Sequence, residues 1–325
     1  MLVYVIKRIL WIIPVFLGVV LLIFTINYIS PSDPVVAQLG SNYTQEQYDA
    51  KKAEMGLDKP FWVQYFSYVK GIITEFDFGT SYSTHREVSE MIGERFWTTL
   101  MLGILSMLLT IIIAIPLGMV AGTHQYSAFD YIVVVGTVIL AALPSFWVAL
   151  MSIIIFAYKL NWLPASGLTS WQCWILPVFC LGLSPVASIT RMTRSSILEV
   201  IRQDYITTAR AKGLPEGKVI RRHALKNSLI PVVTVVGMQV GMIMGGSILV
   251  ESIFSFPGLG TLMNTAIAGQ DYPVIEGCVV VLSVSISIIN LLVDLAYAYI
   301  DPRIRAQYTS GGSKRRKKQK TAAES

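Results

Sequence analysis

Residues 97–121 read Trp-Thr-Thr-Leu-Met-Leu-Gly-Ile-Leu-Ser-Met-Leu-Leu-Thr-Ile-Ile-Ile-Ala-Ile-Pro-Leu-Gly-Met-Val-Ala, and no side chain in this stretch carries a charge. The hydrocarbon core of a bilayer is ~30 Å thick, and a helix needs about 20 mostly apolar residues to cross it. The stretch therefore predicts a membrane-spanning helix.

Comparable apolar runs lie on both sides of this stretch. They occupy residues 9–29, 131–157, 174–190, 229–250 and 274–300. The run at 174–190 is the weakest, because it is short and contains Pro177 and Pro185. Only 14% of the 325 residues are charged and 54% are hydrophobic, whereas soluble domains carry about 25% charged residues. We therefore predict an all-α polytopic membrane protein with about six transmembrane helices.

The first apolar run follows Lys7 and Arg8, as the apolar part of a cleaved signal peptide would. The run is longer than the usual 7–15 residues of such a segment, and residues 30–34 offer no small-residue cleavage site. Residues 1–29 are therefore interpreted as a retained N-terminal transmembrane anchor.

Lysine and arginine residues are unevenly distributed between the runs. With six spans, 19 of the 26 fall on the side that holds residues 1–8, the loop 191–228 and the segment after residue 300; the other 7 lie in residues 30–96 and 158–173. Because basic residues favour the cytoplasmic side of a membrane, both termini and the loop 191–228 are predicted to be cytoplasmic. Residues 30–96 form the predicted extracytoplasmic region, and residues 97–300 the main transmembrane domain.

The last segment, residues 301–325, is predicted to be a basic cytoplasmic tail. Its residues 314–320 read Lys-Arg-Arg-Lys-Lys-Gln-Lys after a Gly-Gly-Ser linker. A tail of this kind, attached to a membrane domain, suits contact with anionic lipid headgroups. We therefore expect membrane lipid, and no nucleic acid, as its partner.

We predict no catalytic, metal or cofactor site in this chain. The histidines lie in predicted loops and the cysteines lack metal-ligand spacing; these residues are His85, His124, His223, Cys173, Cys180 and Cys278. Residues 213–219 approach a phosphate-binding loop, but three residues instead of four separate the glycines, and Val219 replaces the required hydroxyl. ATP would therefore have to be bound by a partner polypeptide.

An ion-coupled secondary transporter is an alternative, because such proteins bind ions on carboxylates within their spans. Asp294 lies in the last predicted span, where an ion pair with Arg303 or Arg305 is favoured over an ion site. Gln239 and Asn290 suit hydrogen bonds between helices. None of these residues indicates a substrate.

Three glycines at a spacing of four residues mark the fifth predicted span: Gly237, Gly241 and Gly245. This spacing places them on one face of a helix, where another backbone can approach closely. The face fits packing within the chain and fits equally a sliding contact with a partner subunit.

The loop between the fourth and fifth predicted spans has the most distinctive pattern. Residues 204–231 read Asp-Tyr-Ile-Thr-Thr-Ala-Arg-Ala-Lys-Gly-Leu-Pro-Glu-Gly-Lys-Val-Ile-Arg-Arg-His-Ala-Leu-Lys-Asn-Ser-Leu-Ile-Pro. Gly213 is typical of a helix end, and Pro215 is compatible with the start of a second helix. The pattern predicts a compact helix–turn–helix.

This loop resembles the Glu-Ala-Ala coupling loop of ABC-importer permeases, specifically that of the dipeptide and oligopeptide branch. Ala209, Gly213 and Leu225 match the general motif. Four positions depart from it in the manner of that branch: Thr207, Thr208, His223 and Lys226. Further stretches resemble the same branch at residues 8–14, 55–60, 77–81, 250–260, 271–273 and 301–305.

The resemblance implies a type I ABC-importer permease in a bacterial inner membrane, paired with a second homologous permease, two cytoplasmic ATPases and an extracytoplasmic substrate-binding protein. It also implies that the loop couples ATP hydrolysis to transport, with Ala209 and Ala211 small enough to enter a groove on the ATPase. The implied coupling residues are Asp204, Tyr205, Thr208, Ala209, Ala211, Gly213, His223 and Leu225. Dipeptides, oligopeptides, glutathione and nickel chelates all remain open as cargo.

Overall fold

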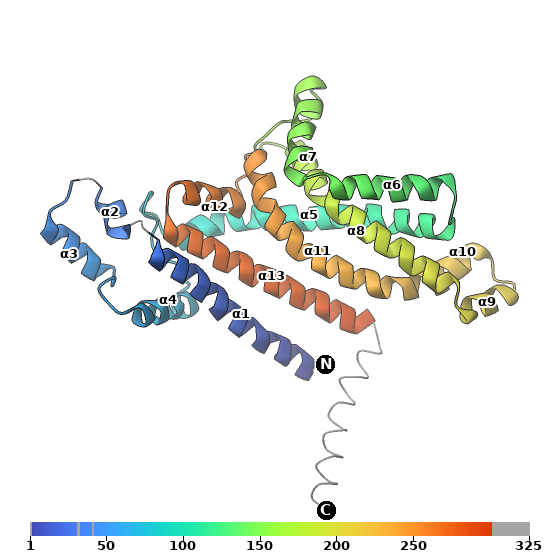
Figure 1. Cartoon of the computed structure of the whole chain (residues 1–325), viewed down its shortest axis with the longest axis horizontal. Coiled ribbons are helices and arrows are strands. Elements are labelled where there is room, and N and C mark those ends of the chain that lie inside the picture. Colours follow the sequence, from blue (N-terminus) through green and yellow to red (C-terminus); the bar gives the residue numbers. More distant parts are fainter. Residues whose placement is uncertain (1, 31–32, 41, 301–325) are drawn as a thin grey trace, which may run out of the picture.

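The computed structural model describes residues 2–30, 33–40 and 42–300, and helices dominate this part of the chain (Figure 1). The predicted basic tail, residues 301–325, lies outside the described residues, as does the side chain of Asp294. Within the described part, five helices contain a stretch long and apolar enough to cross a membrane. They are α1 (Leu2–Ile29), α5 (Val88–Thr123), α8 (Ile175–Ile201), α11 (Leu225–Ile253) and α13 (Tyr272–Ile300).

The third predicted span is broken in the structure. It divides into α6 (Ala128–Ala142) and α7 (Ser145–Ser152), and α7 continues into the π-helical segment η1 (Ile153–Lys159). The two parts meet at 99°. Residues 131–157 were predicted as one span, and the helix is broken there because Pro144 disfavours helical backbone at Leu143, which is extended with φ −79° and ψ 124°.

The two ends of the bent pair lie at different heights along the bundle. Its start at Asp130 contacts Arg194, near the end of α8, whereas the chain beyond η1 returns to Trp171, just before the start of α8. Trp171 and Arg194 are 23 residues apart along η2 and α8, which at 1.5 Å per residue is roughly 35 Å. The pair therefore connects opposite ends of the bundle.

Two other helices extend beyond the predicted spans. The fourth extends from Trp171, through the 3₁₀ turn η2 (Trp171–Trp174), to Ile201. The fifth is preceded without a break by α10 (Glu216–Lys218) and the π-helical η3 (Val219–Ala224). Apolar runs mark only the stretch that suits lipid, and here the helices continue beyond it with charged residues.

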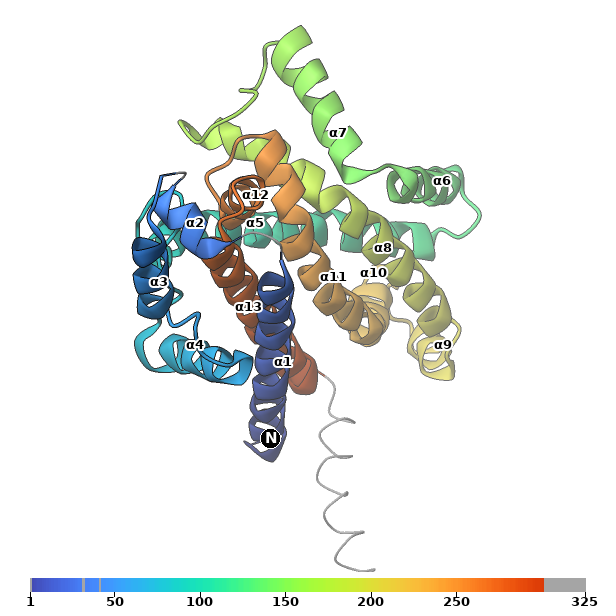
Figure 2. The same cartoon turned by 60° about the vertical axis from the view of Figure 1, so that its left-hand side comes forward.

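The helices of the bundle alternate in direction. α1 lies beside α13 in both views (Figures 1 and 2), and the end of α1 contacts the start of α13 through hydrogen bonds of Asn27 and Ser30. α11 and α13 are also antiparallel, because Gly237 lies against Val293 and Gly241 against Ile286. The start of α1, the end of α13 and residues 202–215 therefore share one end of the bundle, which we name the loop end.

The opposite end, named here the outer end, carries the shorter helices of the 30–96 region. They are α2 (Pro34–Leu39), α3 (Gln45–Glu54) and α4 (Phe61–Glu75). α12 (Leu259–Ala268) lies at the same end between α11 and α13. Buried Asp271 binds residues 81–83 there, accepting hydrogen bonds from the hydroxyls of Ser81 and Ser83 at 2.5 and 2.7 Å. This contact fixes the outer region to the start of α13.

Candidate functional site

The loop end carries a helical hairpin built from the sequence that predicted it. α9 (Asp204–Ala211) follows α8 after two residues, and Gly213 ends it with φ +74° and an N–H that donates to the Arg210 carbonyl at 2.9 Å. Such a left-handed backbone costs other residues ~1–2 kcal/mol. Pro215 then precedes α10, so the chain turns directly into the helix that becomes α11.

A small hydrophobic core holds α9 against its neighbours. Its fully or nearly buried members come from α9 and from η3: Ile206, Ala209, Val219 and Ala224. Val200, Ile201 and Leu214 pack around them. Because Val200 and Ile201 end α8 and Val219 precedes α11, this core joins α9 to two membrane-crossing helices.

Ala209 therefore has a different environment from the one we expected. Its side chain is 7% exposed and packs inside the chain, so it is not available to enter a groove on a partner. The positions that do face outward on α9 include Tyr205, Thr208 and Ala211. Tyr205 is 43% exposed, and its hydroxyl accepts a hydrogen bond from the Asn227 amide at 3.0 Å.

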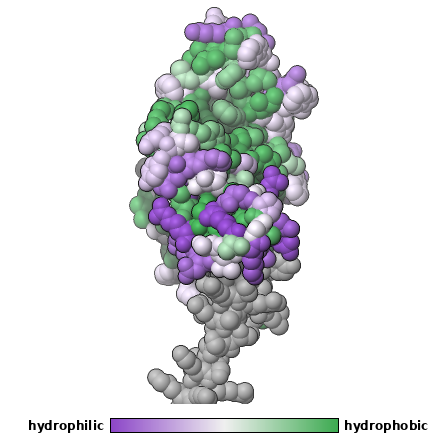
Figure 3. Space-filling view, turned by 90° about the vertical axis from the view of Figure 1, so that its right-hand side faces the viewer, coloured by the Kyte–Doolittle hydropathy of each residue, from purple (hydrophilic) through white to green (hydrophobic). Residues whose placement is uncertain are grey.

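The remaining predicted loop residues have local roles in the structure. Thr208 donates its hydroxyl to the Asp204 carbonyl at 2.9 Å, within α9. The carbonyl of His223 accepts from the Asn227 amide at 3.1 Å, and that of Leu225 accepts from the Ser228 hydroxyl at 2.9 Å. Hydrophilic residues gather at this end of the molecule, next to hydrophobic surface (Figure 3).

Arg210 and Glu216 close the turn around Gly213. The Arg210 guanidinium donates to both carboxylate oxygens, at 3.1 and 2.6 Å. The Glu216 hydrogen bond raises the pKa of Arg210, with partial burial opposing it. Both side chains are about half exposed, at 41% and 55%, and exposed pairs contribute only about 0–1 kcal/mol.

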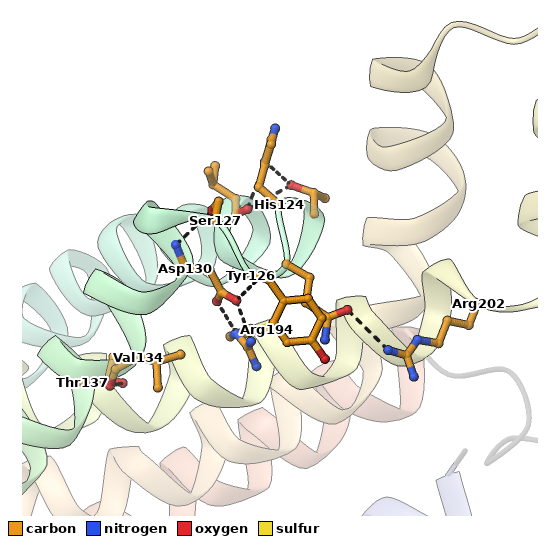
Figure 4. A network of polar contacts seen from close by, with 11 residues as sticks. His124, Tyr126, Ser127, Asp130, Val134, Thr137, Arg194 and Arg202 are labelled. Carbon is orange, nitrogen blue, oxygen red and sulfur yellow. Dashed lines mark hydrogen bonds and ion pairs between the residues drawn. The ribbon is translucent and has the colours of Figure 1, made fainter.

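A second polar contact near the loop end was not predicted (Figure 4). Asp130, at the start of α6, accepts from Arg194 on α8 at 2.5 Å to Nε and 2.8 Å to Nη2. The backbone N–H of Tyr126 donates to the same carboxylate at 3.0 Å, while Ser127 caps the helix through the Asp130 N–H. The contact links the α5–α6 turn to the helix that leads into α9.

Two family models match the chain. The model described as "Binding-protein-dependent transport system inner membrane component" matches residues 114–306, and the model for the N-terminal part of such components matches residues 1–103. The chain belongs to this family. It is therefore a permease component of an inner-membrane transport system, and its predicted all-α membrane architecture is confirmed.

Curated relatives match over nearly their whole length. The dipeptide transport system permease DppB of Alkalihalophilus pseudofirmus is 41% identical, over 94% of this chain and 100% of the relative. DppB of Escherichia coli K12 is 39% identical, over 94% and 99%. The glutathione transport system permease GsiC of Salmonella typhimurium is also 39% identical, over the same shares.

A solved structure shares the fold. A chain of the MetNI methionine ABC transporter, in an inward-facing conformation, superposes with a TM-score of 0.55 and covers 65% of this permease and 97% of its own length. The two sequences are 17% identical.

Close helix packing in this permease relies on more glycines than those we predicted. A Cβ atom at Gly237 would lie 2.4 Å from Val293 Cγ1, whereas one at Gly241 would lie 3.8 Å from Ile286 Cγ2 and one at Gly245 would have nothing within 4 Å. The predicted face thus packs against α13 at one end and is open at the other.

Glycines also allow a close approach of α5 and α8. A Cβ at Gly118 would lie 2.6 Å from the Thr190 carbonyl oxygen, and one at Gly122 would lie 2.8 Å from Ile197 Cγ2. Thr110 also donates its hydroxyl to the Gly182 carbonyl at 3.2 Å. Sequence reasoning missed this contact, although Gly118 and Gly122 have the same four-residue spacing as the glycines of α11.

Proposed function

We propose that this chain is one of two permease subunits of an ATP-driven importer of short peptides, and that the hairpin at residues 204–218 receives the motion of the cytoplasmic ATPases. The observation that carries the coupling role is the core shared by α9, the end of α8 and the start of the helix leading into α11. A force on α9 is transmitted to both spans, because buried packing resists deformation.

Peptide cargo is supported by the dipeptide permeases among the relatives, at 41% and 39% identity. Glutathione is a second candidate, because the GsiC relative is 39% identical over the same share of this chain. Glutathione is itself a tripeptide, so both proposals concern a short peptide delivered by an extracytoplasmic binding protein. An ATP-independent carrier would be recognised by uptake in the absence of the ATPases.

The docking role is tested by placing the same charge on the two faces of α9. Ala211→Asp alters the exposed face, and we expect the ATPases to be lost on co-purification while the chain keeps its thermal stability. Ala209→Asp buries a carboxylate in the small core, and we expect it to lower the stability of the chain itself. Ala53→Asp, on exposed α3 at the outer end, is the matched control.

The functional readout is uptake of labelled Ala-Ala by proteoliposomes that hold both permeases and both ATPases, with the binding protein outside. Wild type and Ala53→Asp should import in the presence of ATP, and Ala211→Asp should not. If Ala211→Asp retains the ATPases and imports normally, the exposed face of α9 is not the docking surface.

A further inference from the structure

The outer end contains a cavity of about 840 Å³, within the size range of small-ligand sites. The end of α1, the helices α2, α3 and α4, and the start of α13 surround it. It lies at the opposite end of the bundle from the coupling hairpin.

A buried carboxylate lies among the cavity-lining residues. Glu276, on the second turn of α13, is 7% exposed, and its side chain accepts a hydrogen bond from the Asn27 amide. Among the ion pairs of the described residues, none involves Glu276. Burying a carboxylate without a cation is costly, so this group is suited to receive a cation from outside the chain.

The side chains around Glu276 suit an ammonium group. The hydroxyl of Tyr68 is also buried in the lining, and it faces the Glu276 carboxylate. Other aromatic rings line the same cavity: Phe24, Tyr28, Tyr82 and Tyr272. Aromatic faces attract cations, and an ammonium group brings three donors for carboxylate and hydroxyl acceptors.

Another wall of the cavity carries positive charge. Lys51 and Lys52 of α3 line it; Lys51 is paired with Glu54 at 2.9 Å, while Lys52 lies 5.9 Å from the centre of the Tyr48 ring. The Asp33 carboxylate is already engaged by the Tyr48 hydroxyl at 2.6 Å. Among the described residues Lys52 forms no ion pair, although it lies near the Asp33 carboxylate, so its ammonium group can contact a ligand carboxylate.

We propose that this cavity binds a short zwitterionic peptide, with its terminal ammonium group on Glu276 and its carboxylate toward Lys52. The choice of peptides as ligand class rests on the function proposed above. The site itself requires neither ATPase nor binding protein, and it would hold peptide on the outer side of the permease.

The test measures equilibrium binding to the full chain in lipid nanodiscs. The probes are Ala-Ala, N-acetyl-Ala-Ala, which lacks the ammonium group, and Ala-Ala-amide, which lacks the carboxylate. We expect acetylation to weaken binding by about tenfold or more, the value of one charge-assisted contact. Glu276→Gln keeps the Asn27 hydrogen bond but removes the charge, so it should bind free and acetylated Ala-Ala equally weakly.

Glu75→Gln is the matched control, because Glu75 is exposed on α4 and does not line the cavity. It should discriminate between the probes as wild type does. Lys52→Gln should instead lose the preference for Ala-Ala over Ala-Ala-amide. The thermal stability of each variant is measured in parallel, so that loss of binding is separated from loss of fold.

Equal binding of free and acetylated Ala-Ala to wild type, or unchanged discrimination in Glu276→Gln, would overturn the proposal. Absence of Ala-Ala binding at millimolar concentration would do the same. ATP-driven uptake by the wild-type assembly is judged separately: uptake without cavity binding refutes only this site, whereas absence of uptake refutes the proposed cargo.

Discussion

Asp130 and Arg194 form a two-point ion pair between α6 and α8, with nitrogen–oxygen distances of 2.5 and 2.8 Å. The Asp130 side chain is only 3% exposed and that of Arg194 is 23% exposed. Both carboxylate oxygens are occupied, because Oδ2 also accepts the Tyr126 N–H. The bent α6–α7 pair is thus held to the rest of the permease at its loop end by a largely desolvated charge contact.

Asp130→Asn should destabilise the permease by about 3 kcal/mol, because it leaves the Arg194 charge partly buried without its partner. The measurement is denaturant unfolding of the purified chain in detergent. Glu94→Gln serves as control: its pair with Arg86 is 2.7 Å long but its side chains are 57% and 46% exposed, so that change should cost far less stability than Asp130→Asn.

The pairing itself is tested by combining Asp130→Asn with Arg194→Gln. Removing both charges leaves no uncompensated ion, so the double variant should lose clearly less stability than the sum of the two single variants. Additive losses would show that the two side chains act independently.

Gly213→Ala should lower the stability of the hairpin at residues 204–218 by about 1 kcal/mol, since alanine is disfavoured at φ +74° although nothing lies within 4 Å of its Cβ. Gly217→Ala is an unusually close control. A Cβ atom at Gly217 would also have nothing within 4 Å, but the backbone there is helical. Alanine at this position should therefore leave the stability unchanged or raise it slightly. Hydrogen exchange of the amides of α9 reports the difference; equal protection in the two variants would contradict the conformational argument.

The sequence pattern predicted correctly those features that depend on neighbouring residues, such as an apolar helix or a turn. The uncharged run at 97–121 lies within α5, and the glycine and proline of the hairpin occupy the predicted turn. Pro144 in the sequence indicates the break between α6 and α7, but we did not use it in the prediction. The break was missed because hydropathy measures apolar content and is insensitive to backbone direction.

Contacts between residues far apart in the chain could not be predicted, because they leave no pattern in the local sequence. Asp130 lies just outside an apolar run and Arg194 was counted only as a loop charge; 64 residues separate them in the chain. Ala209 was predicted to enter a partner's groove because its side chain is small, but the sequence does not distinguish such a groove from the permease's own core. No role was predicted for Glu276, because the cavity around it is assembled from segments far apart in sequence.

Gly237→Ala should destabilise the chain by about 1–3 kcal/mol, because the new methyl group would lie 2.4 Å from Val293 Cγ1 and the side chain or α13 must move. Gly245→Ala meets nothing and should be tolerated. The bulkier Gly245→Leu tests whether the open part of this face contacts a partner subunit or lipid. If it leaves the isolated chain stable but prevents co-purification of the second permease, the open part of the face is a subunit contact; normal assembly would assign it to lipid.

The orientation of the permease in the membrane is predicted from two independent observations, the helix contacts and the charge distribution. The antiparallel contacts of α1 with α13 and of α11 with α13 place the start of α1, the end of α13 and the hairpin at residues 204–218 at one end of the bundle. The excess of basic residues at that end predicts that it faces the cytoplasm.

Single cysteines at exposed positions test this orientation in a background without Cys173, Cys180 and Cys278. Glu46→Cys and Thr169→Cys should react with a membrane-impermeant maleimide in intact cells, whereas His124→Cys, in the α5–α6 turn, should react only after permeabilisation. Labelling of all three from outside would refute the single net crossing of the α6–α7 pair, and an inverted pattern would refute the charge argument while leaving the fold unchanged.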